Sequence, residues 1–393
     1  MLEAPQSLQK RIIPAVRRLR LNDYRSYQDL DLELEEASVI ALCGENGAGK
    51  TNMLEALSLL TAGRGLRRAD YSDCARENGS GGFAVSVELT GPYGPVQLGT
   101  GVDLNEGPGR KFRLNRAPAS SIRALAEHVR VVWLTPSMDG LFSGSPGERR
   151  RFVDRLVLAV DPEHGGRVNA LEKALRNRNR LLEERPGDSA WLDAAEQEAA
   201  EVSIAVAAAR RETIERLGSL ITAGQDGSSP FPWAQIRLEG EIDRLIQEQP
   251  ALEAEDAYRR LLRDNRRRDA AAGRTLVGPQ SSDLEVKHGP KGVAAAQCST
   301  GEQKALLVGL ALAHAKLVKM MSGIAPLTLL DEVAAHFDPR RRNALFALLD
   351  ALGGQVWISG ADPQAFADLP GRSVLVHVTP GHAAQITQGL AGS

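Results

Sequence analysis

A glycine-rich pattern at residues 44–51 constrains the fold of this chain more than any other feature. The segment GENGAGKT matches the phosphate-binding pattern G-x-x-x-x-G-K-[ST]. The apolar run at 38–43 predicts a buried strand before it, and the leucine spacing at 52–60 predicts a helix after it. This order predicts an α/β nucleotide-binding domain whose loop consists of Gly44, Glu45, Asn46, Gly47, Ala48, Gly49, Lys50 and Thr51.

The residue types in this loop suit a nucleoside triphosphate. Glycines let backbone amides converge on phosphate oxygens at the positive end of a helix. We expect Lys50 to neutralise the β- and γ-phosphates of ATP and Thr51 to place its hydroxyl on Mg²⁺.

A second pattern, LTLLDE at residues 327–332, is an apolar strand that ends in two carboxylates. Asp331 would hold Mg²⁺ through water, and Glu332 would act as the general base that polarises the attacking water. An acidic turn after a strand is common in α/β proteins, so this assignment depends on the phosphate-binding loop. Together the two patterns predict a site that hydrolyses ATP.

A third pattern, CSTGEQK at residues 298–304, precedes a predicted helix and lies upstream of the acidic pair. Taken alone it would be an ordinary serine N-cap. Its position between the other two motifs, with residues 336–338 resembling a D-loop, favours the signature of ABC-type ATPases. That resemblance implies an ATP-dependent homodimer, in which the partner's γ-phosphate is contacted by Ser299, Gly301 and Glu302.

Length and composition bound the class of protein. With 393 residues the chain exceeds a usual single domain, and its 42% hydrophobic and 25% charged residues are typical of globular proteins. Three cysteines without a CxxC pair argue against a zinc site or a disulfide framework and favour the cytoplasm. We find neither a signal peptide nor an apolar run that could span a bilayer, so no membrane association is expected.

The pattern of apolar residues predicts the organisation of the chain. An ATPase lobe in two parts, 1–147 and 275–393, is expected to enclose a compact, mainly helical arm at 148–274. Three to five helices are expected in the arm, with Asp188 or Ser189 as one N-cap. Strands are expected at 15–34 (two, around a turn at 22–23), 82–115, 129–134, 276–277, 293–296 and 355–359, and a further helix from 339.

With the three motifs in order, the chain resembles the ABC/SMC superfamily and, from about residue 15 to 380, the RecF family. The resemblance to RecF proteins rests on the segments DYRSY at 23–27, TP at 135–136 with GSP and RRRFVD at 144–154, and TLVGPQSSDL at 275–284. Gln280 and Ser281 replace the histidine and arginine usual in that family. Residues 52–298 are too few for the coiled-coil arms of SMC proteins.

The resemblance implies an SMC-like, ABC-type ATPase head with mixed β-sheets and a helical second lobe, and a nucleotide contact by Arg25. It further implies a recombination mediator that binds double-stranded DNA at single-strand gaps or ends, with RecR and RecO as partners. Such a protein promotes RecA loading in DNA repair, the SOS response and replication restart, with weak DNA-stimulated ATPase activity. Another SMC-like repair or defence ATPase head is the alternative. A transporter ATPase is disfavoured because Ser359-Gly360 stands where transporters keep a switch histidine.

The formal net charge is −2, so any attraction to DNA must come from local basic patches. Arginine clusters lie at the start of the arm and near its end. The alternative is that they form solvated helix faces or pair with neighbours such as Glu148 and Asp154. No segment is typical of a base-reading helix, so no sequence preference is expected. The DNA-contact candidates are Arg149, Arg150, Arg151, Arg266 and Arg267.

Overall fold

The protein is described by a computed structural model. It covers residues 14–34, 36–91, 93–107, 109–225, 229–333, 337–366, 369, 372–380 and 385–387. The chain divides into two compact units, the first from the ranges 1–136 and 318–393 and the second from 137–317. These boundaries differ from the predicted ones at 147/148 and 274/275. Because the second boundary falls inside a long helix, the pattern CSTGEQK belongs to the second unit.

The first unit contains a six-stranded antiparallel sheet in the order β2-β1-β4-β5-β6-β7. Its strands are β1 (Ala15–Tyr24), β2 (Tyr27–Glu33), β4 (Phe83–Gly91), β5 (Gly94–Val102), β6 (Arg110–Leu114) and β7 (Ala117–Ala119). The predicted turn at 22–23 is wrong, because Asn22 still pairs with Asp29 and Ala84 and the chain turns at Arg25 and Ser26. Asp23 instead accepts hydrogen bonds from Arg76 and Ser80.

The second sheet of this unit is mostly parallel, in the order β15-β14-β3-β13-β12-β8. Its strands are β3 (Val39–Cys43), β8 (Val131–Leu134), β12 (Leu327–Leu330), β13 (Val356–Gly360), β14 (Ser373–His377) and β15 (Gln385–Thr387). β3, β8, β12 and β13 are buried throughout, as apolar runs of a covered parallel sheet should be, and all four were predicted. β13 lies between β3 and β12, so the segments that follow these three strands share one edge.

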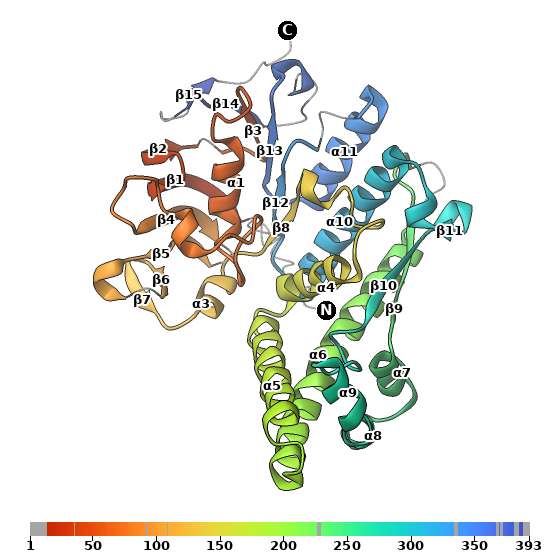
Figure 1. The fold of residues 1–393 in the computed structure, drawn as a ribbon. Helices are drawn as coiled ribbons and strands as arrows, with labels where there is room; N and C mark the ends of the chain where they lie inside the picture. The colour runs from red at the N-terminus through yellow and green to blue at the C-terminus, as the bar shows by residue number, and fades with distance from the viewer. Residues whose placement is uncertain are drawn as a thin grey trace, which may run out of the picture. The chain divides into compact units, whose positions relative to one another are not determined.

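Helix α1 (Lys50–Ser58) lies between the two sheets (Figure 1). Met53, Leu54 and Leu57 on it are fully buried. Arg110 from β6 holds its C-terminal end, donating to the carbonyl oxygens of Leu59, Thr61 and Gly63. Helices α2 (Tyr71–Cys74), α3 (Ile122–Ala126) and α11 (Pro339–Leu352) also belong to this unit.

The second unit is mainly helical and also contains a three-stranded sheet. Among the described residues of the predicted arm there are six helices, α4 to α9, where three to five were predicted. The strand expected at 276–277 is absent. There Leu276 and Val277 bond to Asp269 and Tyr258 instead. Asp188 is confirmed as the N-cap of α6. The elements are α4 (Pro146–Val160), α5 (His164–Glu184), α6 (Ser189–Ala223), α7 (Glu241–Glu248), α8 (Ala251–Asp264), α9 (Arg266–Ala272), β9 (Ala234–Glu239), β10 (Asp283–His288) and β11 (Val293–Ala294).

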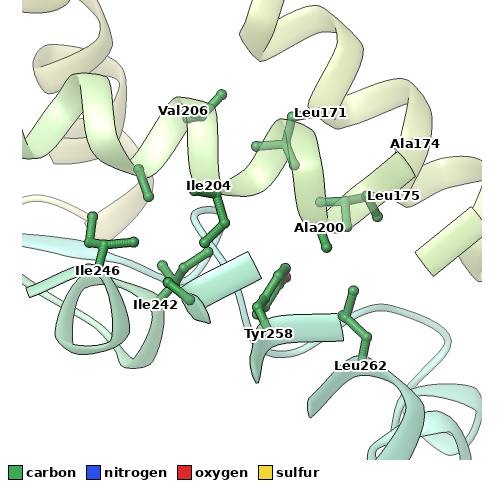
Figure 2. Packing of buried hydrophobic residues seen from close by; sticks show 13 residues of the cluster. Leu171, Ala174, Leu175, Ala200, Ile204, Val206, Ile242, Ile246, Tyr258 and Leu262 are labelled. Carbon is green, nitrogen blue, oxygen red and sulfur yellow. The ribbon is translucent and has the colours of Figure 1, made fainter. Parts of the chain in front are cut away.

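Apolar side chains from α5, α6, α7 and α8 form the core of this unit (Figure 2). Beside it lies a buried ionic cluster. Arg178 is fully buried and donates to Glu196 (3.2 Å), Asp269 (2.7 Å), Thr275 (2.8 Å) and the carbonyl oxygen of Leu262 (2.6 Å). Every donor nitrogen of this guanidinium is paired, which offsets the cost of burying its charge. The cluster fixes α5, α6, α8 and α9 to one another.

Helix α10 (Thr300–Ser322) corrects the expectation that no apolar run could span a bilayer. Within the described residues it is the one helix with the length and hydropathy of a membrane span. The helix meets the criterion by its length and composition only. Half of its most apolar window (50%) is buried inside the structure. Core helices of globular proteins also meet this criterion, and Leu306 and Leu310 of α10 are buried.

Candidate nucleotide-binding site

The glycine-rich loop joins β3 to α1 in a conformation that depends on its glycines. Gly49 has φ +112°, and a Cβ there would lie 2.5 Å from the Tyr27 hydroxyl. A Cβ on Gly44 would lie 2.2 Å from the carbonyl oxygen of Val378. Lys50 is 4% exposed, and its ammonium donates to the carbonyl oxygens of Gly44 (2.7 Å) and Glu45 (2.8 Å). The loop therefore holds its cation against its own backbone at the start of a helix.

Thr51 and Asp331 meet although 280 positions separate them. The Thr51 hydroxyl lies 3.0 and 3.1 Å from the two carboxylate oxygens of Asp331. A hydroxyl beside one carboxylate suits Mg²⁺, which prefers oxygen ligands and completes its shell with water and phosphate oxygens. Among the described residues no group of three His, Cys, Asp or Glu side chains could hold a metal ion. The Thr51–Asp331 pair thus fits Mg²⁺ accompanied by a nucleotide.

Glu332 follows Asp331 in a left-handed backbone conformation, with φ 54°. Its backbone amide donates to the hydroxyl of Ser359 (3.0 Å), which in turn donates to Asp331 (2.7 Å). Ser359 is fully buried at the end of β13. Sequence reasoning had noted Ser359 only as a replacement for a histidine.

Arg25 lies in the same unit and is already engaged. Its guanidinium donates to both carboxylate oxygens of Glu55 (2.8 and 2.6 Å) and to the carbonyl oxygen of Asp73 (2.6 Å). The hydrogen bond with Glu55 raises the pKa of Arg25. Glu55 is fully buried on α1 and also accepts from Arg67 (2.9 Å). A contact of Arg25 with nucleotide stays a prediction. In the sequence, the one feature that could have drawn attention to Glu55 is its position inside the apolar stripe of residues 52–60.

The pattern CSTGEQK begins α10 with reciprocal caps. Ser299 accepts a hydrogen bond from the Glu302 amide (3.4 Å), and the Glu302 carboxylate accepts from the Ser299 amide (3.1 Å) and hydroxyl (3.0 Å). Glu302 also pairs with Lys291, and these contacts lower the pKa of Glu302 to about 2. A Cβ on Gly301 would meet nothing within 4 Å among the described residues. The backbone there is open to close approach.

The structure separates the DNA-contact candidates into two groups. Arg149 donates to Asp283 (2.7 and 2.8 Å), Arg150 to the carbonyl oxygen of Ser282 (2.8 Å), and Arg266 to Glu196 and Asp193. These three arginines stabilise the second unit. Arg151 and Arg267 are exposed, and neither makes a salt bridge within the part of the chain described here.

The acidic partners expected for this cluster have other roles. Glu148 completes a capping box with Ser145, and Asp154 binds His164 and Arg210. Asp283, more than a hundred positions from Arg149, was not expected, and no local pattern pointed to it. The D-loop residue His336 lies outside the described residues.

Known proteins resemble this chain over nearly its whole length. The family model for the RecF/RecN/SMC N terminal domain matches residues 15–385. The DNA replication and repair protein RecF of Mesorhizobium japonicum is 50% identical over 367 residues, which is 93% of this chain and 96% of that protein. The chain belongs to the RecF family.

Solved structures agree with this RecF-family assignment at the level of the fold. The recombination mediator protein RecF-ATPrS in the RecFOR pathway matches with a TM-score of 0.84 at 20% identity, over 96% of this chain and 99% of that one. An SMC head bound to the C-winged helix domain of ScpA matches with a TM-score of 0.52 at 15% identity, over 95% and 97%. The expected family and the expected SMC-like ABC-type fold are confirmed.

Proposed function

We propose that this RecF-family chain is an ATP-dependent, DNA-binding recombination mediator. The observation that supports the proposal is the Thr51–Asp331 contact beside the buried Lys50, because these three side chains are of the types that bind phosphate and metal ions. Lys50 would neutralise the β- and γ-phosphates. Thr51 and Asp331 would hold Mg²⁺, which when bound withdraws charge from the phosphate oxygens.

Hydrolysis needs a base that accepts a proton from the attacking water. Glu332 is half-buried and directly follows Asp331, so it is the carboxylate assigned to this role. Ser299, Gly301 and Glu302 would contact the γ-phosphate of a second copy, so ATP would hold two copies together. The open backbone at Gly301 supports that approach.

The proposed biological role comes from the relatives. The solved RecF is named a recombination mediator of the RecFOR pathway, and the curated relative is named for DNA replication and repair. For this chain we propose cytoplasmic binding to duplex DNA at gaps or ends, partnership with RecR and RecO, and promotion of RecA loading in repair and replication restart. The 50% identity to RecF proteins favours this role over that of another SMC-like repair or defence head.

Binding of gapped duplex DNA tests the proposal. Fluorescence anisotropy with ATP, with ADP and without nucleotide should show tighter binding with ATP only, and light scattering should show dimers under the same condition. Lys50→Met, which removes the phosphate-facing cation, should show neither effect. Equal DNA affinity in all three nucleotide conditions, with monomers throughout, would contradict the proposal.

A further inference from the structure

Ser359 is the penultimate residue of β13, and its hydroxyl makes its hydrogen bonds with the acidic pair that follows β12. Its hydroxyl donates to the Asp331 carboxylate (2.7 Å) and accepts from the Glu332 amide (3.0 Å). A serine hydroxyl has a single proton to donate, and here that proton goes to Asp331. Ser359 is fully buried, so its hydroxyl is committed to these two residues.

We propose that Ser359 is a positioning residue that fixes the Mg²⁺-binding carboxylate and the general base together. The proposal rests on the ATPase function proposed above and assigns a role within the same site. Asp331 receives hydroxyl donors from two sides, Ser359 and Thr51, and both reach the oxygen Oδ1. Two donors on one oxygen fix the rotation of the carboxylate, and the second oxygen lies 3.1 Å from Thr51.

The backbone of Glu332 gives the second half of the argument. Its φ of 54° lies in the left-handed region, which residues other than glycine rarely adopt. Such a conformation persists where surrounding groups hold it, and the Ser359 hydroxyl holds the amide of that same residue. Ser359 thereby acts on the position of the base without touching water or nucleotide.

Three substitutions at this site separate positioning from packing. Ser359→Ala removes both hydrogen bonds, Ser359→Thr keeps the hydroxyl, and Ser359→Cys keeps the volume with a weaker donor. Thr328→Val is the matched control. Thr328 is buried on β12, the strand that leads into Asp331, and its hydroxyl has no hydrogen-bond partner among the described residues.

We expect Ser359→Ala to lower kcat for ATP hydrolysis by roughly 10- to 100-fold, because small misplacements of reacting groups have effects of that size. The Mg²⁺ concentration for half-maximal turnover should rise by about 10-fold, the lower end of the roughly 10- to 100-fold effect of removing outer-shell partners. Affinity for ATP measured without Mg²⁺ should stay within about two-fold, since Lys50 is untouched. Ser359→Thr should restore most of the turnover, Ser359→Cys should give an intermediate kcat, and Thr328→Val should match wild type.

A double variant tests the link to the base. At saturating Mg²⁺, where the weakened Asp331 site is filled, adding Ser359→Ala to Glu332→Gln should cause little further loss of turnover, because the base is already absent. If wild type hydrolyses ATP and Ser359→Ala has the same kcat and Mg²⁺ dependence, the inference is overturned while the proposed function stands. It is also overturned if Thr328→Val loses as much turnover as Ser359→Ala. If Ser359→Ala does not fold, the Cys and Thr variants take its place in the test. Equal kcat and equal Mg²⁺ dependence in Ser359→Cys and Ser359→Thr would then overturn the inference. Wild type that neither binds nor hydrolyses ATP would refute the proposed function itself.

Discussion

Glu332 combines two features at the scale of a single residue: a carboxylate next to Asp331, the proposed Mg²⁺ ligand, and a left-handed backbone held by Ser359. Glu332→Gln keeps the size of the side chain but cannot accept a proton from water. We expect ATP binding to persist while hydrolysis falls by at least about 100-fold, the usual contribution of a general base. The ATP-bound dimer should then accumulate, as measured by light scattering over time. Asp350→Asn, on the exposed face of α11, is the control and should turn over normally. Wild-type turnover in Glu332→Gln would remove this residue from the role of base.

Residues with a motif around them could be predicted, and their partners could not. Short sequence patterns with a recognisable spacing contain Lys50, Thr51, Asp331 and Glu332. Glu55, Ser359 and Asp283 act through residues far away in sequence, and no local spacing encodes those pairs. The same limit explains the arginine cluster of α4. Its charges were visible in the sequence, but which of them are neutralised depends on β10, more than a hundred residues later.

At the scale of elements, α10 contains a histidine whose burial should make stability depend on pH. The His314 ring donates from Nε2 to the carbonyl oxygen of Leu156 in α4 (2.9 Å). Burial, with a smaller contribution from nearby Arg155, lowers the pKa of His314 to about 4. The folded state therefore resists protonation of His314. The stability that the neutral ring contributes is fully present above the unfolded pKa of about 6.5 and is lost as pH falls toward 4. The total is on the order of 3 kcal/mol.

His314→Gln keeps a donor and cannot be protonated. Between pH 6.5 and 4, its free energy of unfolding in urea should fall less steeply than that of wild type. His377→Gln, on the exposed face of β14, should keep the wild-type slope. Identical slopes for wild type and His314→Gln would show that His314 does not resist protonation in the folded state.

The N-terminus of α10 carries the prediction about dimerisation. Ser299→Arg places a bulky cation where the partner's γ-phosphate is expected. ATP binding by the monomer should be unchanged, because the phosphate-binding loop lies in the other unit, and ATP-driven dimers should be absent by light scattering. Ser145→Arg is a matched control, since Ser145 forms the same type of capping box on α4. Both variants lose a helix cap, at about 1 kcal/mol. Equal dimerisation in the two variants would argue against the signature assignment.

Elements with strong local patterns were predicted, and those that depend on tertiary contacts were missed. The buried strands β3, β12 and β13 are apolar runs bounded by turn residues, so their existence and type were clear. β10 was not expected, and the strand expected at 276–277 is absent. Leu276 and Val277 have strand-forming side chains but are held by Asp269 and Tyr258. The first hairpin turned later than expected, since Asn22 retains its strand partners on both sides.

At the scale of the whole molecule, sequence patterns indicated the family but not how distant segments combine. The parallel sheet pairs Val39 with Val356 and Ser373, and Leu327 with Val131. Such pairings join both ends of the chain in one unit, and nothing in the apolar pattern of a single strand specifies its neighbour. The order of the three motifs did predict the class of fold, because it is the order found in ABC-type ATPases.

The proposed DNA binding is considered at the scale of the whole molecule, because a net charge of −2 offers no general attraction to phosphates. The proposed binding therefore depends on local basic side chains, and Arg151 and Arg267 are the two candidates that the structure leaves exposed. In the ATP-bound state, replacing both with Ala should weaken binding equally for all DNA sequences. The slope of log affinity against log salt should flatten by up to about 0.9 for each DNA phosphate that these arginines neutralise in the wild type. The melting temperature should not change.

Arg149→Ala is the matched control: it breaks the pair with Asp283, so it should lower the melting temperature and leave the salt slope unchanged. If the Arg149 variant flattens the slope and the double variant does not, the arginine that is paired in this structure binds DNA, and the exposed ones are a solvated helix face.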